Sequence, residues 1–259
     1  MEIFVLVKTV PDSEARMELA SGGAGLSVEE KYELNFFDAI AVEQAVRIRE
    51  SIQETRVTAL SYGPLRAQEG LRKAVAMGAD RAIHVECQDS PWWDPLETAR
   101  VLAAVLGREP YDLILCGRKA TDDQACQVGP MVAELLGIPH VGSAVVLQIF
   151  DGGLEAVRDL GSLQERVRCR LPLLVSVQKG LVEPRVPSIQ GVMKGMRLQP
   201  TKLTPADLGV DPWAPRGSWK LVGFKEAPKR PAVRMIEGPD ALSRARELAR
   251  ILREEIRVA

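Results

Sequence analysis

The first 136 residues alternate between short apolar runs and longer segments with helical periodicity. The apolar runs predict strands at 3–8, 56–61, 81–86 and 111–116, and the periodic segments predict helices at 37–50, 65–77, 94–106 and 126–136. Uninterrupted apolar runs are typical of parallel strands that are buried on both faces. The sequence therefore predicts an α/β fold with a doubly wound, mostly parallel sheet of the Rossmann-like, adenine-nucleotide-binding type.

The helical segments carry matching end signals. Asp94 stands before Pro95 at the start of the third helix, as an N-cap residue followed by proline at the first helical position. Gly78 follows the second helix, and Gly137 follows the fourth. Glycine after a last helical turn indicates a C-terminal cap.

The pattern changes after residue 140. Three short strand-like runs at 143–149, 154–159 and 163–170 are separated by an Asp-Gly-Gly and a Gly-Ser turn signal. They predict a small antiparallel insertion. The apolar run 171–178 then predicts a return to the main sheet.

Proline dominates the last part of the chain. Eight prolines lie between Glu183 and Pro231, which predicts an extended arm rather than a packed domain. One amphipathic helix is predicted at 239–256. We therefore expect a nucleotide-binding α/β domain at 1–199 and a C-terminal arm with a terminal helix at 200–259. Such an arm needs a surface to lie on, either this chain's own core or a partner chain.

Composition narrows the function classes. The 259 residues are 46% hydrophobic and 27% charged, which is ordinary globular composition, and the formal net charge is −1. This balance does not favour nucleic acid or an anionic membrane as a partner. The N-terminus lacks the marks of a signal peptide, and no apolar run approaches the roughly 18 residues of a membrane span. We expect a cytoplasmic protein.

Metal and catalytic motifs are missing from the sequence. The four cysteines have no C-x-x-C spacing and there are two histidines, so we expect reduced, mostly buried thiols and no metal site. His84 lies inside a predicted strand, where a hydrogen-bonded structural histidine is expected. No nucleophile elbow, zinc-protease motif or full P-loop is present. We predict no catalytic residue.

The segment 117–130 is the best candidate for a binding site. It follows an apolar strand and opens a helix, and open α/β sheets bind ligands beyond the carboxyl ends of their strands. Gly117 would let a ligand approach the backbone, and free N–H groups around 126–130 would hold a phosphate. Polar side chains between them would hold ribose hydroxyls. The alternative is an ordinary polar βα loop.

Three other segments would complete this site. A strand order of 3-2-1-4 would bring the end of the first strand beside the Gly117 loop, where Lys8 would contact the phosphate or remain solvated. Asn35 precedes the first helix and serves as its N-cap or as a ligand contact. Tyr62, at the end of the second strand, offers a wall for an adenine.

Five segments, in order along the chain, resemble the β subunit of electron transfer flavoproteins. They are Val7–Asp12, Asn35–Ala45, Ala76–His84, Gly117–Pro130, and Glu183–Ile189 followed by Val192–Lys194. The resemblance implies a heterodimer in which the α subunit carries the redox-active FAD and this subunit holds a structural AMP. It implies a carrier without chemistry of its own, which takes electrons from flavin dehydrogenases of the acyl-CoA dehydrogenase type to a quinone oxidoreductase or another acceptor.

Two alternatives stay open. Bifurcating relatives hold a second FAD in the β site, and they commonly have Asp-Gly-Asp-Thr where this chain has Asp122-Asp123-Gln124-Ala125. The missing glycine favours AMP. A stand-alone nucleotide-binding protein similar to universal stress proteins is the other alternative, and the proline-rich arm argues against it. The lysine-rich run of the family is reduced here to Lys194-Gly195-Met196-Arg197.

The resemblance also assigns residues to two sites. The segment with Glu183, Pro184 and Arg185 leads into a loop that anchors the dehydrogenase in the family, with Ile189 as the exposed apolar anchor; a buried Ile189 is the alternative. The residues expected to hold the nucleotide are Leu6, Lys8, Asn35, Phe36, Phe37, Asp38, Tyr62, Gly117, Arg118, Lys119, Ala120, Thr121, Asp122, Asp123, Gln124, Ala125, Cys126, Gln127, Val128 and Gly129.

Overall fold

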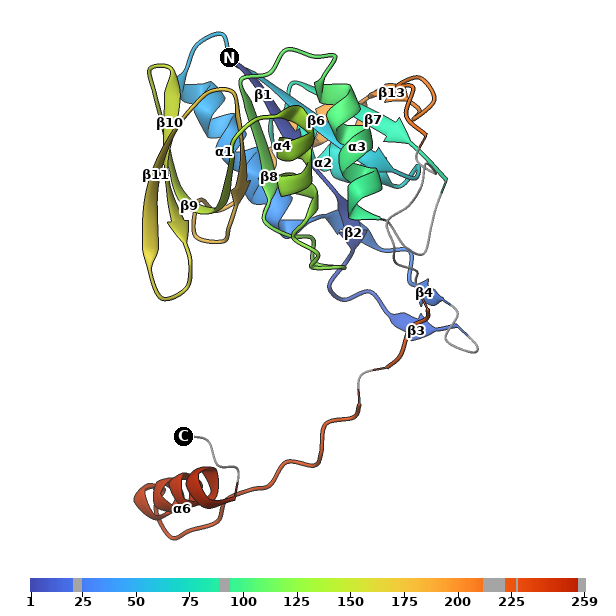
Figure 1. Ribbon diagram of the computed structural model, residues 1–259. Helices are drawn as coiled ribbons and strands as arrows, with labels where there is room; N and C mark the ends of the chain where they lie inside the picture. The colour runs from blue at the N-terminus through green and yellow to red at the C-terminus, as the bar shows by residue number, and fades with distance from the viewer. Residues whose placement is uncertain (21–24, 89–93, 212–221, 227, 256–259) are drawn as a thin grey trace. The chain divides into compact units, whose positions relative to one another are not determined.

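The protein divides into two compact units, shown in a computed structural model (Figure 1). The described residues are 1–20, 25–88, 94–211, 222–226 and 228–255. The first unit is Met1–Phe224 and the second is Lys225–Ala259. The first unit therefore includes residues 200–224, which the proline pattern assigned to the arm.

A nine-stranded sheet, counted over the described residues, forms the centre of the first unit, in the order β11-β10-β9-β12-β8-β1-β6-β7-β13. The four strands expected from the apolar runs are β1, β6, β7 and β8, and their neighbours pair in parallel in the order 3-2-1-4. This confirms the doubly wound fold. The bounds of these strands and of the returning strand β12 are Glu2–Leu6, Arg56–Gly63, Arg81–Glu86, Leu113–Gly117 and Leu173–Val177.

Four helices cover the two faces of this sheet. The core on one face includes side chains of α1 and α2, and the core on the other face includes side chains of α3 and α4. Asp94 caps α3 as expected, because its carboxylate accepts hydrogen bonds from the N–H groups of Leu96 and Glu97. Gly78 ends α2 with a φ of 129°. The bounds are Phe36–Ser51, Ala67–Met77, Pro95–Leu106 and Val128–Leu136 for α1 to α4.

The expected antiparallel insertion forms one edge of the same sheet (Figure 1). Strand β9 pairs in parallel with β12 and antiparallel with β10, and β10 pairs antiparallel with β11. The bounds are His140–Phe150, Gly153–Asp159 and Gln164–Arg170 for β9, β10 and β11.

Several elements were not expected from the sequence. Strand β13 pairs in parallel with β7 at the far edge of the sheet, within the proline-rich part of the chain. Helix α5 follows Pro187, where we expected no helix. Two short antiparallel pairs, β2 with β5 and β3 with β4, lie between β1 and α1. The bounds of β13, α5, β2, β5, β3 and β4 are Thr201–Leu203, Ile189–Met196, Thr9–Pro11, Tyr32–Leu34, Met17–Leu19 and Leu26–Val28.

The second unit contains helix α6, Ala241–Glu254. The carboxylate of Asp240 caps the helix by accepting a hydrogen bond from the N–H of Ser243. The expected end of the helix, at Ile256, lies outside the described residues. Leu242, Leu248 and Leu252 are exposed along this helix, while Ile251 is buried, so part of its apolar surface is uncovered.

Candidate functional site

The expected binding site lies where the strand order changes direction, between β1 and β8. The ends of these two strands lead into Lys8 and into the loop after Gly117. The chain before α1 joins them, because the N–H of Asn35 donates to the carbonyl oxygen of Lys8 at 2.9 Å. The structure therefore brings together three segments that are far apart in sequence, at the point where an open α/β sheet binds its ligand.

Asp38 ties these three segments to one another. Its Oδ2 accepts a hydrogen bond from the backbone N–H of Lys8 at 2.8 Å, and its Oδ1 accepts one from the N–H of Gly117 at 2.9 Å. The residue is 5% exposed. Burial raises the pKa of this carboxyl group to about 7, although both backbone hydrogen bonds favour the ionised form. Asp38 therefore shapes the site through the backbone on both sides of it.

The start of α1 occupies the space that a side chain at residue 117 would need, so only glycine fits there. A Cβ atom there would contact the Asp38 carboxylate, and it would lie 2.6 Å from the Cβ of Phe37. We expected this glycine to admit a ligand. In the structure the start of α1 makes a close approach at Gly117, and the approach of a ligand there stays a prediction.

Asn35 occupies the N-cap position of α1, but its side chain does not cap the helix. Its Nδ2 donates to the carbonyl oxygen of Lys119 at 2.9 Å, and its Oδ1 accepts from the N–H of Thr121 at 3.2 Å. The residue is 1% exposed. The expectation of an ordinary cap is therefore wrong. Asn35 holds the backbone of the loop after β8.

Lys8 contacts two carboxylates of the same loop. Its Nζ lies 2.8 Å from Asp122 and 2.8 Å from Asp123. Burial alone would lower the pKa of Lys8, but the two carboxylates outweigh it and the pKa is raised. Lys8 is therefore a cation at neutral pH. It lies beside the loop, as the strand order predicted.

The backbone of the loop before α4 includes residues in the left-handed region. Gln124 and Cys126 have positive φ values of 50° and 58°, and Gln127 returns to the right-handed region at the N-cap of α4. Successive residues with left-handed and right-handed backbone form a concave nest of N–H groups that binds anions. Over the described residues, the N–H groups of 126–129 donate no hydrogen bond. The positive end of the α4 dipole adds to the attraction.

The other expected site residues are spread around this loop. The Nζ of Lys119 donates to Gln124 Oε1 at 2.9 Å, and the guanidinium of Arg118 donates to Gln178 at 2.6 Å. The sequence offered no reason to single out Gln178. Leu6 is buried in β1 beneath the site. Tyr62 lies on β6, two strands from β8, and its hydroxyl donates to Glu97 on α3.

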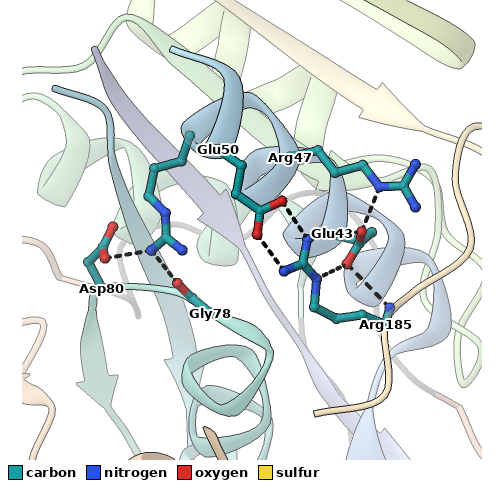
Figure 2. Close-up of polar contacts among 7 residues, drawn as sticks. Glu43, Arg47, Glu50, Gly78, Asp80 and Arg185 are labelled. Atoms are coloured by element: carbon teal, nitrogen blue, oxygen red, sulfur yellow. Dashed lines mark hydrogen bonds and ion pairs between the residues drawn. The ribbon is translucent and has the colours of Figure 1, made fainter. Parts of the chain in front are cut away.

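A second region of interest surrounds Arg185, one of the expected docking residues. Figure 2 shows its guanidinium between Glu43 and Glu50 of α1, with hydrogen bonds of 2.6–3.2 Å to both carboxylates. The Glu43 side chain is 2% exposed and also accepts a hydrogen bond from Arg47. Burial alone would raise the pKa of Glu43, but the hydrogen bonds from Arg185 and Arg47 hold it below its usual range.

Helix α5 follows this segment and packs closely on α2. A Cβ atom at Gly191 would collide with the carbonyl oxygen of Ala76, and one at Gly195 would lie 2.5 Å from the carbonyl oxygen of Arg72. The two glycines therefore let the two helix backbones touch. Ile189 is 82% exposed, as expected of an anchor, but it is the first residue of a helix and not part of a loop.

The apolar side chains of α5 are turned to solvent. Ser188 caps the helix through the N–H of Gly191, and the exposed large apolar residues of the segment are Val186, Ile189, Val192, Met193 and Met196. Two hollows of the surface border this segment, and Val75 and Lys194 line both. The molecule is therefore hollowed beside α5.

The four cysteines are free thiols as expected, but the expectation that they are mostly buried is wrong: Cys116 is buried, Cys87 and Cys169 are half-buried and Cys126 is exposed. The two histidines have structural partners. His84 is fully buried, and its Nε2 lies 2.9 Å from the carbonyl oxygen of Gly63, which confirms the expected structural histidine. His140 Nε2 lies 3.2 Å from Ser176 Oγ, and burial lowers the pKa of this histidine. No group of three or more potential metal ligands occurs among the described residues.

Comparison with known proteins agrees with the fold. A doubly wound, Rossmann-like α/β sheet, with a loop at its switch point, defines the class of protein. The family model for the electron transfer flavoprotein domain matches residues 25–208. The electron transfer flavoprotein subunit beta of Bacillus subtilis is 34% identical over 261 residues and covers 100% of both chains. The human protein of that name is 33% identical over 255 residues, 97% of this chain and 99% of its own.

The chain therefore belongs to the electron transfer flavoprotein family and corresponds to its β subunit. This places it among the flavoproteins of electron transport, as the motifs along the chain suggested. None of the helices that the structure describes has the length and apolar character needed to cross a membrane.

Proposed function

We propose that this chain is the β subunit of a heterodimeric electron transfer flavoprotein and that it binds a structural AMP at the loop 117–129. The α subunit holds the redox-active FAD. The heterodimer carries electrons from flavin dehydrogenases of the acyl-CoA dehydrogenase type to a quinone oxidoreductase or another acceptor. This chain supplies binding and orientation, and it supplies no catalytic group.

The observation that carries the nucleotide assignment is the set of free N–H groups at 126–129. They form a nest at the N-terminus of α4, where a phosphate replaces hydrogen bonds that the backbone does not otherwise make. Lys8, Arg118 and Lys119 are the cations that lie at this loop. Asn35 and Asp38 hold the loop from behind through three of its backbone groups, Lys119, Thr121 and Gly117.

Two features favour AMP over a second FAD. Lys8 is already paired with Asp122 and Asp123, so its charge is taken up by this acidic pair. A dinucleotide brings a second phosphate to this acidic stretch, and AMP does not. The loop sequence Asp122-Asp123-Gln124-Ala125 also lacks the glycine that is common in bifurcating relatives.

The nucleotide content of the purified heterodimer tests this assignment. We expect one AMP and one FAD per heterodimer, identified by mass spectrometry after acid release. Two FAD molecules per heterodimer would favour the bifurcating alternative. A monomer that binds nucleotide and recruits no flavin-binding chain would favour the stand-alone alternative.

Helix α5 supports the docking half of the proposal. The segment from Glu183 and Pro184 to Ile189 is held by Arg185 on one side and by the glycine contacts with α2 on the other. An exposed apolar side chain on a fixed helix loses little entropy when it is buried by a partner. We infer that the dehydrogenase binds here, with Ile189 as its anchor.

The C-terminal unit has a separate role in the proposal. Helix α6 exposes Leu242, Leu248 and Leu252 within its own unit, and we infer that the α subunit covers them. Deletion of residues 232–259 should weaken the heterodimer and leave AMP binding intact. Unchanged assembly after this deletion would show that the arm is not an assembly element.

A further inference from the structure

One of the two hollows beside α5 lies where the last turns of α1 and α2 meet the segment 185–188 and the start of α5. It has a volume of about 440 Å³, which is in the range of small-ligand sites. We call it the Arg49 hollow and define it by Arg49, Arg185, Ser188, Gly191 and Lys194, together with the last residues of α2.

The lining of the Arg49 hollow is positively charged. Three cations line it, and none of the described carboxylates does. The charge of Arg185 is compensated, because Glu43 and Glu50 both accept hydrogen bonds from its guanidinium. Figure 2 shows that Arg49 pairs with Asp80. The third cation, on α5, pairs with no carboxylate of the described residues, so the hollow keeps a positive charge.

The two other cations keep donors that nothing in the described chain uses. Arg49 donates through its Nη1 alone, to the carbonyl oxygen of Gly78 and to Asp80, both at 2.6 Å. Its Nε and Nη2 have no acceptor among the described residues. The Nζ of Lys194 donates to the carbonyl oxygen of Ala79 at 3.2 Å, which takes one of its three N–H groups.

A structural role for these cations accounts for only part of their donors. Both donate to backbone carbonyl oxygens just after α2, as basic side chains commonly do at a helix C-terminus. That role takes one nitrogen atom of Arg49 and one N–H group of Lys194. Since both side chains line the hollow, the remaining donors are available to an occupant.

The occupant that fits these donors is a small oxyanion. Guanidinium and ammonium groups bind phosphate and carboxylate oxygens through charge-assisted hydrogen bonds. The Ser188 hydroxyl accepts from the N–H of Gly191, and its own proton has no acceptor in the part of the chain that the structure describes. Donors from α1, from α5 and from Ser188 surround the space, which suits tetrahedral phosphate better than a planar carboxylate.

We propose that the Arg49 hollow binds a phosphate-like oxyanion, held by Arg49, Lys194 and Ser188. The site is separate from the loop 117–129, because Arg49 follows Asp38 by eleven residues along α1, which is roughly 16 Å. The inference does not rest on the proposed function. A bound oxyanion would tie the start of α5 to the end of α1.

The test titrates inorganic phosphate into the full-length chain by calorimetry, with and without saturating AMP. We expect one phosphate per chain and the same affinity in both conditions. Lys194→Gln and Arg49→Gln should each weaken phosphate binding at least fivefold. Lys202→Gln, which removes an exposed lysine of β13 outside the hollow, is the matched control and should bind normally.

Further measurements check the fold and the kind of anion. Urea denaturation shows whether each variant is folded. Because Arg49 also pairs with Asp80, Lys194→Gln decides the result if Arg49→Gln does not fold. Sulfate should bind as phosphate does, and acetate should bind more weakly. Phosphate should also slow hydrogen exchange of the amides in 185–191.

Each outcome decides the inference. Weaker phosphate binding in the Lys194 variant, with the control unchanged, supports it. No phosphate binding to the unsubstituted chain overturns it. Loss of phosphate binding when AMP is present also overturns it, because the anion then lies at the loop 117–129. If Arg197→Gln weakens binding and Arg49→Gln does not, the anion lies in the second hollow and the inference is wrong. A chain that binds phosphate and no AMP would contradict the proposed function and leave this inference in place.

Discussion

Arg185 donates three hydrogen bonds to the buried carboxylate of Glu43, one from its backbone N–H and two from its guanidinium (Figure 2). The two residues are 142 positions apart. The contact fastens the chain before α5 to the middle of α1, and Glu50 holds the outer side of the same guanidinium. Arg185 is thus bound within its own chain, where it holds the segment that leads into α5.

Substitution of Arg185 should separate the roles of the arginines around Glu43. Arg185→Ala leaves a carboxylate that is 2% exposed with Arg47 as its remaining cation, so we expect a loss of about 1–3 kcal/mol in the free energy of unfolding. Arg47→Ala removes a side chain that is 52% exposed and should cost less than about 1 kcal/mol. Urea denaturation measures both. Equal losses of unfolding free energy in the two variants would contradict the role of Arg185 in fastening the chain before α5 to α1.

The nucleotide site should respond to a carboxylate at the N-cap of α4. Gln127→Glu places a negative charge beside the free N–H groups. The charge repels phosphate, and it interacts favourably with the positive end of the α4 dipole. We expect AMP affinity to fall at least tenfold, which is about 1.4 kcal/mol, with unfolding stability unchanged or raised. Calorimetric titration measures the affinity. Gln148→Glu, on an exposed position of β9, is the matched control and should bind AMP normally.

Much of the fold followed from the sequence because its signals are local. Continuous apolar runs marked the parallel strands, and turn residues marked the hairpins of the insertion. The loop after Gly117 was found because it follows a strand and opens a helix, and the expected strand order brought Lys8 beside it. These inferences needed no knowledge of which side chains meet.

The contacts that shape the site were not predictable in this way. Asn35 looked like a helix cap, and only the fold shows that its amide reaches the backbone of Lys119 and Thr121, 84 and 86 residues away. Helix α5 was hidden by the surrounding prolines and by Gly191, which lowers helix propensity. Its stability comes from packing on α2 through that same glycine.

Asp38 should make the stability of the protein depend on pH. Its pKa is raised from 3.8 to about 7 in the folded state, so the folded chain binds more protons than the unfolded chain between these values. The contribution of Asp38 to the free energy of unfolding is therefore highest at low pH, and it falls as the pH rises from about 4 to 7. Urea midpoints across this range should show that fall, and Asp38→Asn should remove it. An unchanged slope in the variant would assign the effect to other groups.

Gly117 should not tolerate a methyl group. In Gly117→Ala the new Cβ atom would lie 2.6 Å from Phe37 Cβ and 2.9 Å from the backbone nitrogen of Asp38, so α1 and β8 must separate. Overpacking of this kind costs about 1–3 kcal/mol, and the loop displacement should also weaken AMP binding. Gly25→Ala is the control, since its nearest neighbour would be 3.9 Å away. Thermal melting of the two variants compares them.

Ile189 should matter for the dehydrogenase and not for folding. Its side chain is 82% exposed, so Ile189→Ala should change the free energy of unfolding by less than about 0.5 kcal/mol while it slows electron transfer from the dehydrogenase. The defect should appear as a higher KM for the flavoprotein at an unchanged kcat, because an anchor contributes to binding.

Gly191→Ala provides a second route to the same result. Its methyl group would collide with the carbonyl oxygen of Ala76, so α5 must shift on α2 while the Ile189 side chain stays intact. We expect the same rise in KM, together with faster hydrogen exchange of the amides in 189–196. Leu65→Ala, which shortens another exposed side chain (61% exposed), is the matched control. It should change neither the KM for the flavoprotein nor the hydrogen exchange of the amides in 189–196. Normal coupling in both α5 variants would show that the dehydrogenase binds elsewhere.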